Sequence, residues 1–175
     1  FAADYGAAFR RAAPPEASDP RRVLVVSSGS LGQLVEIALV TAFRLAGYRP
    51  VILTDYDRWM GAYYREIGVQ EHLYWDECFR QVPMAEAVQL MASIGSFEQL
   101  IKTDYCGARI GKYAASTVLR HLRVGRLDLS DRSVRDALLP FLHRAMCYAK
   151  TAEGIVETLR PQLVLSVDTG YSPRG

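Results

Sequence analysis

A loop with closely spaced glycines has residue types suited to ligand binding. Residues 27–32 read Ser-Ser-Gly-Ser-Leu-Gly and separate an apolar stretch from a segment with helical periodicity. Glycines let backbone N–H groups approach a ligand, and the positive end of the helix dipole favours an anion there. The candidate binding residues in this loop are Ser28, Gly29, Ser30 and Gly32. A tight turn that binds no phosphate explains the same pattern.

A nicotinamide dinucleotide is the first ligand to consider for such a loop. Asp55 lies 23 residues after Gly32, near the position of the ribose-binding carboxylate in NAD sites. The third glycine of the dinucleotide fingerprint is missing, because Val35 stands where one common variant has it. The Tyr-x-x-x-Lys pair of short-chain reductases is also missing, since Arg109 follows Tyr105 at that spacing. An NAD(P)-dependent oxidoreductase and a non-catalytic lobe that only binds a partner stay alternatives, and we predict no cofactor.

A second polar loop begins at Asp168, directly after the apolar stretch 163–167. Open α/β sheets place their ligand crevice at the carboxyl ends of parallel strands. Asp168 is therefore a candidate general base, or an acceptor for a hydrogen bond from a sugar hydroxyl. A helix cap or a turn residue is the structural alternative. Tyr171 lies in the same loop and is a candidate binding residue.

The segment 104–120 mixes glycines with polar residues and has no clean period, which often marks a functional site. Arg109 is the candidate binding residue there. The structural alternative is a helix that begins at Asp104 as its cap, with Tyr105 and Tyr113 as core aromatics.

Histidines and cysteines give no pattern for a metal site or a disulfide framework. The three histidines lack a second ligand at metal spacing, and the three cysteines lack a Cys-x-x-Cys pair. These residues are His72, His121, His143, Cys78, Cys106 and Cys147. We predict no metal and a reducing compartment.

Charge and hydropathy limit the classes of partner and the cellular locations that fit this chain. The chain has 21 basic and 19 acidic residues, a net charge of +2, and no basic stripe of the kind that nucleic acid binding requires. Arg21–Arg22 and Arg120–Arg126 are the basic clusters, and we interpret both as solvated edges, with a peripheral contact to an anionic membrane as the alternative. No apolar run reaches about 20 residues, and the amino end lacks a signal-peptide stretch. We therefore predict a cytoplasmic protein.

The elements that must position these residues follow a strand–helix–strand order. Residues 23–26 and 51–54 are continuously apolar and predict buried parallel strands. Between them, apolar residues at helical spacing predict a helix that ends at Gly47; they are Leu31, Val35, Ala38, Leu39, Ala42, Leu45 and Ala46. The pattern next predicts a helix over 58–67, ended by Gly68, and a short strand over 69–75. This repeats the strand–helix–strand order.

Beyond residue 75 the pattern is mostly helical. Residues 76–124 read as helices interrupted at Pro83, Gly95, Gly107 and Gly111. Apolar positions from Val134 to Leu159 predict one long helical face, in which Pro140 must kink the helix or start a second one. Residues 163–167 then read as another buried parallel strand.

Together these elements predict an α/β fold with a Rossmann-like parallel sheet flanked by helices. Residues 1–20 form a short helical segment and a proline-rich linker, and residues 21–175 form the Rossmann-like domain.

Two stretches suggest a family. The first, RRVLVVSSGSLGQLVEIALVTAFRLAGYRPVILTD, resembles the amino-terminal lobe of GT-B glycosyltransferases. The second, YCGARIGKYAASTVLRHLRVGRLDL, precedes a long helix and RPQLVLSVDTGYSP, and it resembles the bacterial capsule and surface-polysaccharide branch. The resemblance covers residues 22–175.

The resemblance implies a glycosyltransferase lobe that holds the acceptor, with the nucleotide-sugar donor on a second lobe. It implies a carboxy-terminal donor-binding lobe or partner subunit, and no bound metal or cofactor. The glycine loop, Arg109 and the Asp168 loop would then face the acceptor. Arg109 and helix ends would stabilise the leaving diphosphate, and Asp168 would assist deprotonation of the acceptor.

Overall fold

The computed structural model describes residues 21–27, 33–54 and 58–166. Within these ranges, contacts divide the chain into two compact units. Residues 21–78 and 158–166 belong to the first, here called the sheet unit, and residues 79–157 form the second, the helical unit. Each of these units has a hydrophobic core of its own.

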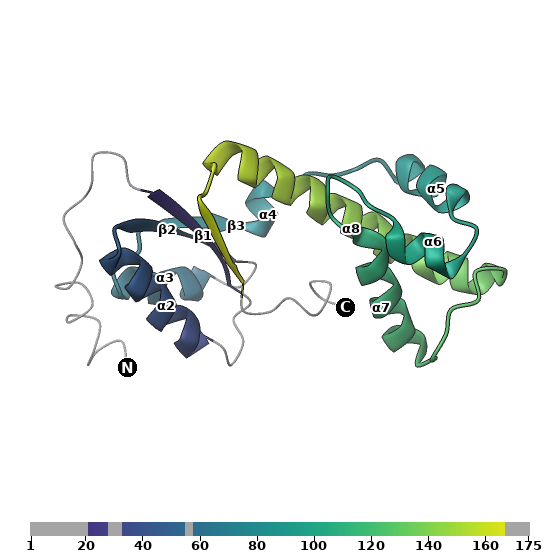
Figure 1. Cartoon of the computed structure of the whole chain (residues 1–175), viewed down its shortest axis with the longest axis horizontal. Coiled ribbons are helices and arrows are strands. Elements are labelled where there is room, and N and C mark those ends of the chain that lie inside the picture. The colour runs from purple at the N-terminus through teal and green to yellow at the C-terminus, as the bar shows by residue number, and fades with distance from the viewer. Residues whose placement is uncertain (1–20, 28–32, 55–57, 167–175) are drawn as a thin grey trace. The chain divides into compact units, whose positions relative to one another are not determined.

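The sheet unit is built on a parallel sheet of four strands (Figure 1). The strands are β1 (Arg21–Ser27), β2 (Tyr48–Thr54), β3 (Glu71–Tyr74) and β4 (Leu163–Ser166), in the order β3-β2-β1-β4. All three neighbouring pairs are parallel, which confirms parallel strands at 23–26 and 51–54, and at 163–166 of the predicted 163–167. The prediction that this last strand is buried is wrong, because β4 is the edge strand next to β1 and Leu163 and Val164 are 41% and 59% exposed. The fold is therefore α/β with a Rossmann-like parallel sheet flanked by helices.

Two helices connect the first three strands, α2 (Gln33–Leu45) and α3 (Arg58–Glu66). Gly47 and Gly68 follow them with φ of 81° and 88°, the left-handed conformation that glycine adopts most easily at a helix end. Both predicted helix ends are confirmed.

The core of the sheet unit lies between the sheet and these helices. Side chains alternate along a strand, so Val23, Val25 and Ser27 share one face of β1. The buried hydrophobic residues of this core are Val23, Val25, Ile37, Val40, Ile52, Tyr64, Ile67 and Val69.

The buried face of α2 differs from the predicted one. Val35 and Leu45 are each more than half exposed, and Ala38 and Ala42 are also exposed. Ile37, Val40 and Thr41 are buried instead, with Glu36 beside them. The helix is apolar around most of its circumference, so its periodicity did not determine which face packs on the sheet.

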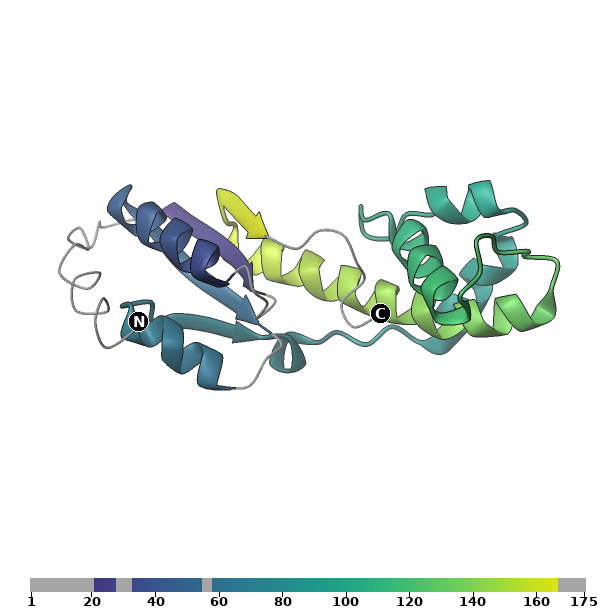
Figure 2. The same ribbon diagram turned by 90° about the horizontal axis from the view of Figure 1, so that it is seen from below.

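The helical unit contains α5 (Met84–Ser93), α6 (Phe97–Lys102), α7 (Ile110–Leu122) and most of α8 (Arg132–Leu159). A short helix, α4 (Trp75–Cys78), precedes it in the sheet unit. Figure 1 and Figure 2 show α7 and α8 running in different directions. The helical core is larger than that of the sheet unit and includes Leu100, Ile110, Val118, Leu127, Leu138, Leu142 and Met146.

Three expectations in this region are corrected. Gly111 does not interrupt a helix, because it is the second residue of α7. A Cβ atom there would overlap the Leu100 carbonyl oxygen, so this glycine permits close contact between α6 and α7. Of the two alternatives for Pro140, the start of a second helix is excluded, because Pro140 lies inside the single helix α8. Asp104 caps no helix, since Arg109 is the N-cap residue of α7, and Tyr113 is exposed, not in the core.

None of the helices in the described ranges is long and apolar enough to cross a membrane.

Candidate functional site

The carboxyl edge of the sheet carries a row of hydroxyl groups. The four strands end at Ser27, Thr54, Tyr74 and Ser166. Ser27 pairs with Thr54 and Thr54 with Tyr74, so these three side chains lie on the same face of the sheet. Parallel strands end at one edge, and this edge is where α/β folds bind ligands. We call this row the hydroxyl edge.

Ser27 belongs to a buried polar cluster behind this edge. Its Oγ donates to Glu36 Oε2 at 2.7 Å, and the Tyr64 hydroxyl donates to the same oxygen at 2.7 Å. The Tyr64 and Ser27 oxygens are 3.2 Å apart. Ser27, Glu36 and Tyr64 are 2%, 1% and 0% exposed. We call these three residues the Glu36 cluster; β1, α2 and α3 supply one residue each.

The hydrogen bonds of the Glu36 cluster use one of the two carboxylate oxygens of Glu36. Both donors bind Oε2, whereas Oε1 is buried and has no hydrogen-bond partner among the described residues. A carboxylate oxygen offers two lone pairs, and a buried one without a donor costs about 1–3 kcal/mol or more. Such a group is maintained at a cost to stability, which makes it a candidate ligand-binding group.

Tyr64 stays a hydrogen-bond donor throughout the physiological pH range. Burial raises the pKa of its hydroxyl far above the ordinary value, and the neighbouring Glu36 carboxylate raises this pKa further. The hydrogen bond with Ser27 acts in the opposite direction but is outweighed. Tyr64 therefore holds the Glu36 carboxylate in place and does not act as a base.

Sequence reasoning missed Glu36 because a glutamate in the first turn of a helix is ordinary helix chemistry. The sequence does contain an indication that Glu36 is buried. Glu36 lies four residues before Val40 and next to Ile37, which puts all three on one helical face. That face is the buried one.

The predicted site residues are mostly outside the described ranges. Ser28, Gly29, Ser30, Gly32, Asp55, Asp168 and Tyr171 all fall there. Arg109 is described: it lies in the helical unit, is exposed, and caps α7 without a side-chain hydrogen bond to the helix.

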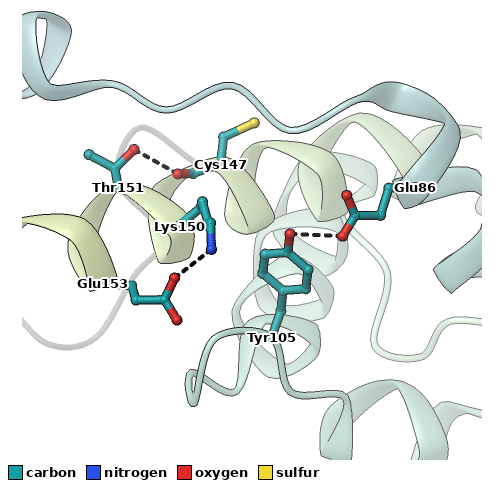
Figure 3. Close-up of polar contacts among 6 residues, drawn as sticks. All are labelled: Glu86, Tyr105, Cys147, Lys150, Thr151 and Glu153. Carbon is teal, nitrogen blue, oxygen red and sulfur yellow. Dashed lines mark hydrogen bonds and ion pairs between the residues drawn. The ribbon is translucent and has the colours of Figure 1, made fainter. Parts of the chain in front are cut away.

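A second polar cluster lies in the helical unit, around the turn between α6 and α7 (Figure 3). Backbone hydrogen bonds of 2.9 Å and 3.0 Å join Tyr105 and Ala108 in both directions. Cys106 and Gly107 occupy the turn with φ of 49° and 74°. The Tyr105 hydroxyl donates to Glu86 Oε1 of α5 at 2.8 Å. The turn is thus attached to α5.

The same turn is attached to α8 through Glu153. Lys150 Nζ donates to Glu153 Oε2 at 2.7 Å, and the Cys106 thiol donates to the same side chain. Burial, then the Glu153 carboxylate, raises the pKa of Cys106, so the thiol stays protonated and is a poor nucleophile. Burial and the hydrogen bond to Glu86 raise the pKa of Tyr105 to about 12. These groups hold the turn in place and are not activated for chemistry.

On the same part of α8, Cys147 and Thr151 hold the segment before α5. Thr151 Oγ1 donates to the Cys147 carbonyl at 2.7 Å and accepts the Arg80 N–H at 2.8 Å. The Val82 N–H lies 3.4 Å from Cys147 Sγ. His143 Nε2 is 2.7 Å from the Val82 carbonyl and must donate to it, so His143 is not a base for the cysteine.

Among the residues that the structure describes, no group of three or more His, Cys, Asp or Glu side chains could hold a metal ion. Comparisons with protein-family models, with curated proteins and with solved structures gave no match for this chain.

Proposed function

We propose that this chain is the acceptor-side lobe of a cytoplasmic glycosyltransferase. It would transfer a sugar from a nucleotide-sugar donor to a hydroxyl of a carbohydrate or another acceptor, in surface polysaccharide or glycoconjugate biosynthesis. The resemblance over residues 22–175 motivates the reaction class, and the Rossmann-like sheet agrees with it. The proposed partner is a carboxy-terminal donor-binding lobe or a partner subunit.

The observation that carries the proposal is the buried carboxylate of Glu36 in the first turn of α2. A carboxylate there offsets the positive end of the helix dipole and repels a phosphate group. This inference differs from the expectation, drawn from the sequence, that the helix end favours an anion. A neutral ligand with hydroxyl donors suits the hydroxyl edge better, and a sugar acceptor is such a ligand.

The same observation weighs against the oxidoreductase alternative. A dinucleotide site of the Rossmann type places its pyrophosphate at the amino terminus of the first helix, which is α2 in this chain. The Glu36 carboxylate would lie within one helical turn of that pyrophosphate. We infer that neither NAD nor NADP binds at this helix end.

In this proposal two residues have separate roles. Glu36 Oε1 accepts a hydrogen bond from an acceptor hydroxyl and orients it. Asp168 takes the proton as that hydroxyl attacks the donor sugar. Ser28, Gly29, Ser30, Gly32 and Tyr171 complete the binding surface.

Ligand-induced thermal stabilisation separates the two functions, since a ligand that binds only the folded state raises its melting temperature. We expect NAD and NADP to leave the melting temperature unchanged, and neutral oligosaccharides on a glycan array to be bound. Glu36→Gln keeps the side-chain shape but removes the charge, and it should abolish glycan binding. A rise in melting temperature with NAD or NADP, and none with any sugar, would overturn the proposal.

A turnover assay with donor and acceptor in the complete enzyme tests the base. Asp168→Asn should lower the turnover by about 100-fold or more, because general-base catalysis contributes at least that much. Wild-type turnover in this variant would remove Asp168 from the mechanism.

A further inference from the structure

The outer face of α7 is basic from end to end. Arg109, Lys112, Ser116, Arg120 and Arg123 follow one another at steps of three or four residues, so they share one face of the helix. The opposite face is buried in the helical core through Ile110, Ala114, Ala115 and Val118. We call the outer surface, with Tyr113, the cationic face.

Acidic residues are missing from this stretch. Residues 106–127 contain five of the 21 basic residues of the chain and none of the 19 acidic ones. The rest of the chain therefore has 16 basic and 19 acidic residues and is net negative. Positive charge is concentrated on one helix of a nearly neutral protein, and this concentration favours an anionic surface as the partner.

The cationic face is solvent-accessible. Arg109, Lys112 and Arg123 are exposed, and no ion pair in the described part of the chain involves them. Figure 1 shows the end of α7 at the lower margin of the helical unit. All three charges are therefore free to contact an anionic surface.

Exposed apolar side chains accompany these charges. Tyr113 is 38% exposed on the cationic face, and Leu122 and Val124 are 37% and 43% exposed where α7 ends. A soluble polyanion such as heparin contacts mainly the charges, whereas a lipid interface also takes up aromatic and aliphatic side chains. Among anionic partners, this combination fits a membrane surface.

We propose that the cationic face and the Leu122–Val124 turn dock the protein on the surface of a membrane that contains anionic lipids. The contact is peripheral: the cations bind lipid phosphates, and Tyr113, Leu122 and Val124 enter the headgroup layer. This inference does not depend on the proposed function, because α7 contributes no residue to the Glu36 cluster.

Vesicle co-sedimentation of the full chain tests the charges. Wild type should bind vesicles that contain phosphatidylglycerol, should not bind pure phosphatidylcholine, and should dissociate as the ionic strength rises. The triple variant Arg109→Gln, Lys112→Gln, Arg123→Asn should bind about 100-fold more weakly, at about fivefold per cation. Asparagine is chosen at 123 because it tolerates the left-handed backbone found there.

A matched control removes the same charge elsewhere. Lys102, Arg132 and Arg160 are exposed, and Arg160 has a φ of 47°, close to the 55° of Arg123. Lys102→Gln, Arg132→Gln, Arg160→Asn should therefore bind vesicles like wild type. Equal loss in both triple variants would show that net charge alone drives binding and would overturn the proposal, as would no binding of wild type to anionic vesicles. Circular dichroism melting confirms that the variants are folded.

The double variant Leu122→Ser, Val124→Ser tests the apolar part. It should weaken binding to anionic vesicles and leave binding to heparin, a soluble polyanion, unchanged. If it has no effect on vesicles, and heparin binds wild type as tightly as vesicles do, the cationic face is a polyanion site and membrane docking is wrong.

Discussion

The Glu36 cluster of the sheet unit and the Tyr105–Glu86 pair of the helical unit are built from the same parts. In each, a tyrosine hydroxyl donates to a glutamate at 2.7–2.8 Å. Glu36 is buried, and its Oε1 has no hydrogen-bond partner among the described residues, whereas Glu86 is exposed to water, which satisfies its remaining lone pairs. Residue types alone therefore do not identify a site, whereas the unmet hydrogen-bonding capacity of a buried group does.

The largest change in stability is expected at the close contact between α6 and α7 in the helical unit. Gly111→Ala places a methyl group against the Leu100 carbonyl oxygen and forces α6 and α7 apart. We expect a loss of about 3 kcal/mol or more in the free energy of unfolding, measured with urea. Gly125→Ala is the control, since a Cβ there meets no atom within 4 Å. Equal stability of both variants would show that the α6–α7 contact is looser than described.

The next test compares the two tyrosines directly. Tyr64→Phe removes a donor from a buried carboxylate, and we expect a loss of about 1–3 kcal/mol in the free energy of unfolding. Tyr105→Phe removes a donor from an exposed glutamate and should cost about 0.5 kcal/mol or less. Urea denaturation of both variants gives the two values. If the Tyr105 variant lost more, the contrast between the clusters would be reversed.

The loss of stability at alkaline pH should also depend more on Tyr64 than on Tyr105. Folding raises the pKa of both tyrosines above the 10.0 of an unperturbed side chain, and to about 12 for Tyr105. The unfolded chain therefore loses these protons first, so the stability they contribute is complete below pH 10.0 and declines above it. We expect Tyr64→Phe to flatten this decline more than Tyr105→Phe, in melting curves measured at rising pH. Parallel curves for wild type and both variants would contradict this.

The smallest effect is expected at Glu153. The hydrogen bond from Lys150, then that from Cys106, lowers the pKa of Glu153 below 4.5, so its stabilising effect is present above that pH and is lost as the carboxylate is protonated. Both members of this ion pair are partly exposed to solvent, and such pairs contribute little. Glu153→Gln should melt like wild type at neutral pH and show a slightly weaker loss in acid. A clear drop in melting temperature at neutral pH would mean that this contact carries part of the fold.

Much of the sheet unit was predictable from the sequence. Continuous apolar runs at 23–26 and 51–54 give strands that are buried on both faces, and Gly47 and Gly68 end the helices between strands. These are local signals, which a single sequence contains in full. The fold class follows from their order along the chain.

The candidate site was less predictable, because it depends on tertiary contacts. Glu36 is buried because the side of α2 that carries it packs against β1. Since α2 has apolar residues on most sides, its sequence does not show which side packs against the sheet. Gly111 likewise read as a helix breaker, since its contact with Leu100 involves another helix.

The helices α7 and α8 are each followed by an arginine in the left-handed conformation, Arg123 and Arg160. Glycine would adopt this backbone without the penalty of about 1 kcal/mol that a Cβ atom brings. An arginine recovers part of that penalty by placing its charge at the negative end of the helix dipole. In evolutionary terms, each of these positions keeps a permanent positive charge at the cost of a less favourable backbone conformation. A mutation to glycine would relieve the backbone and, at position 123, remove the positive charge that follows α7.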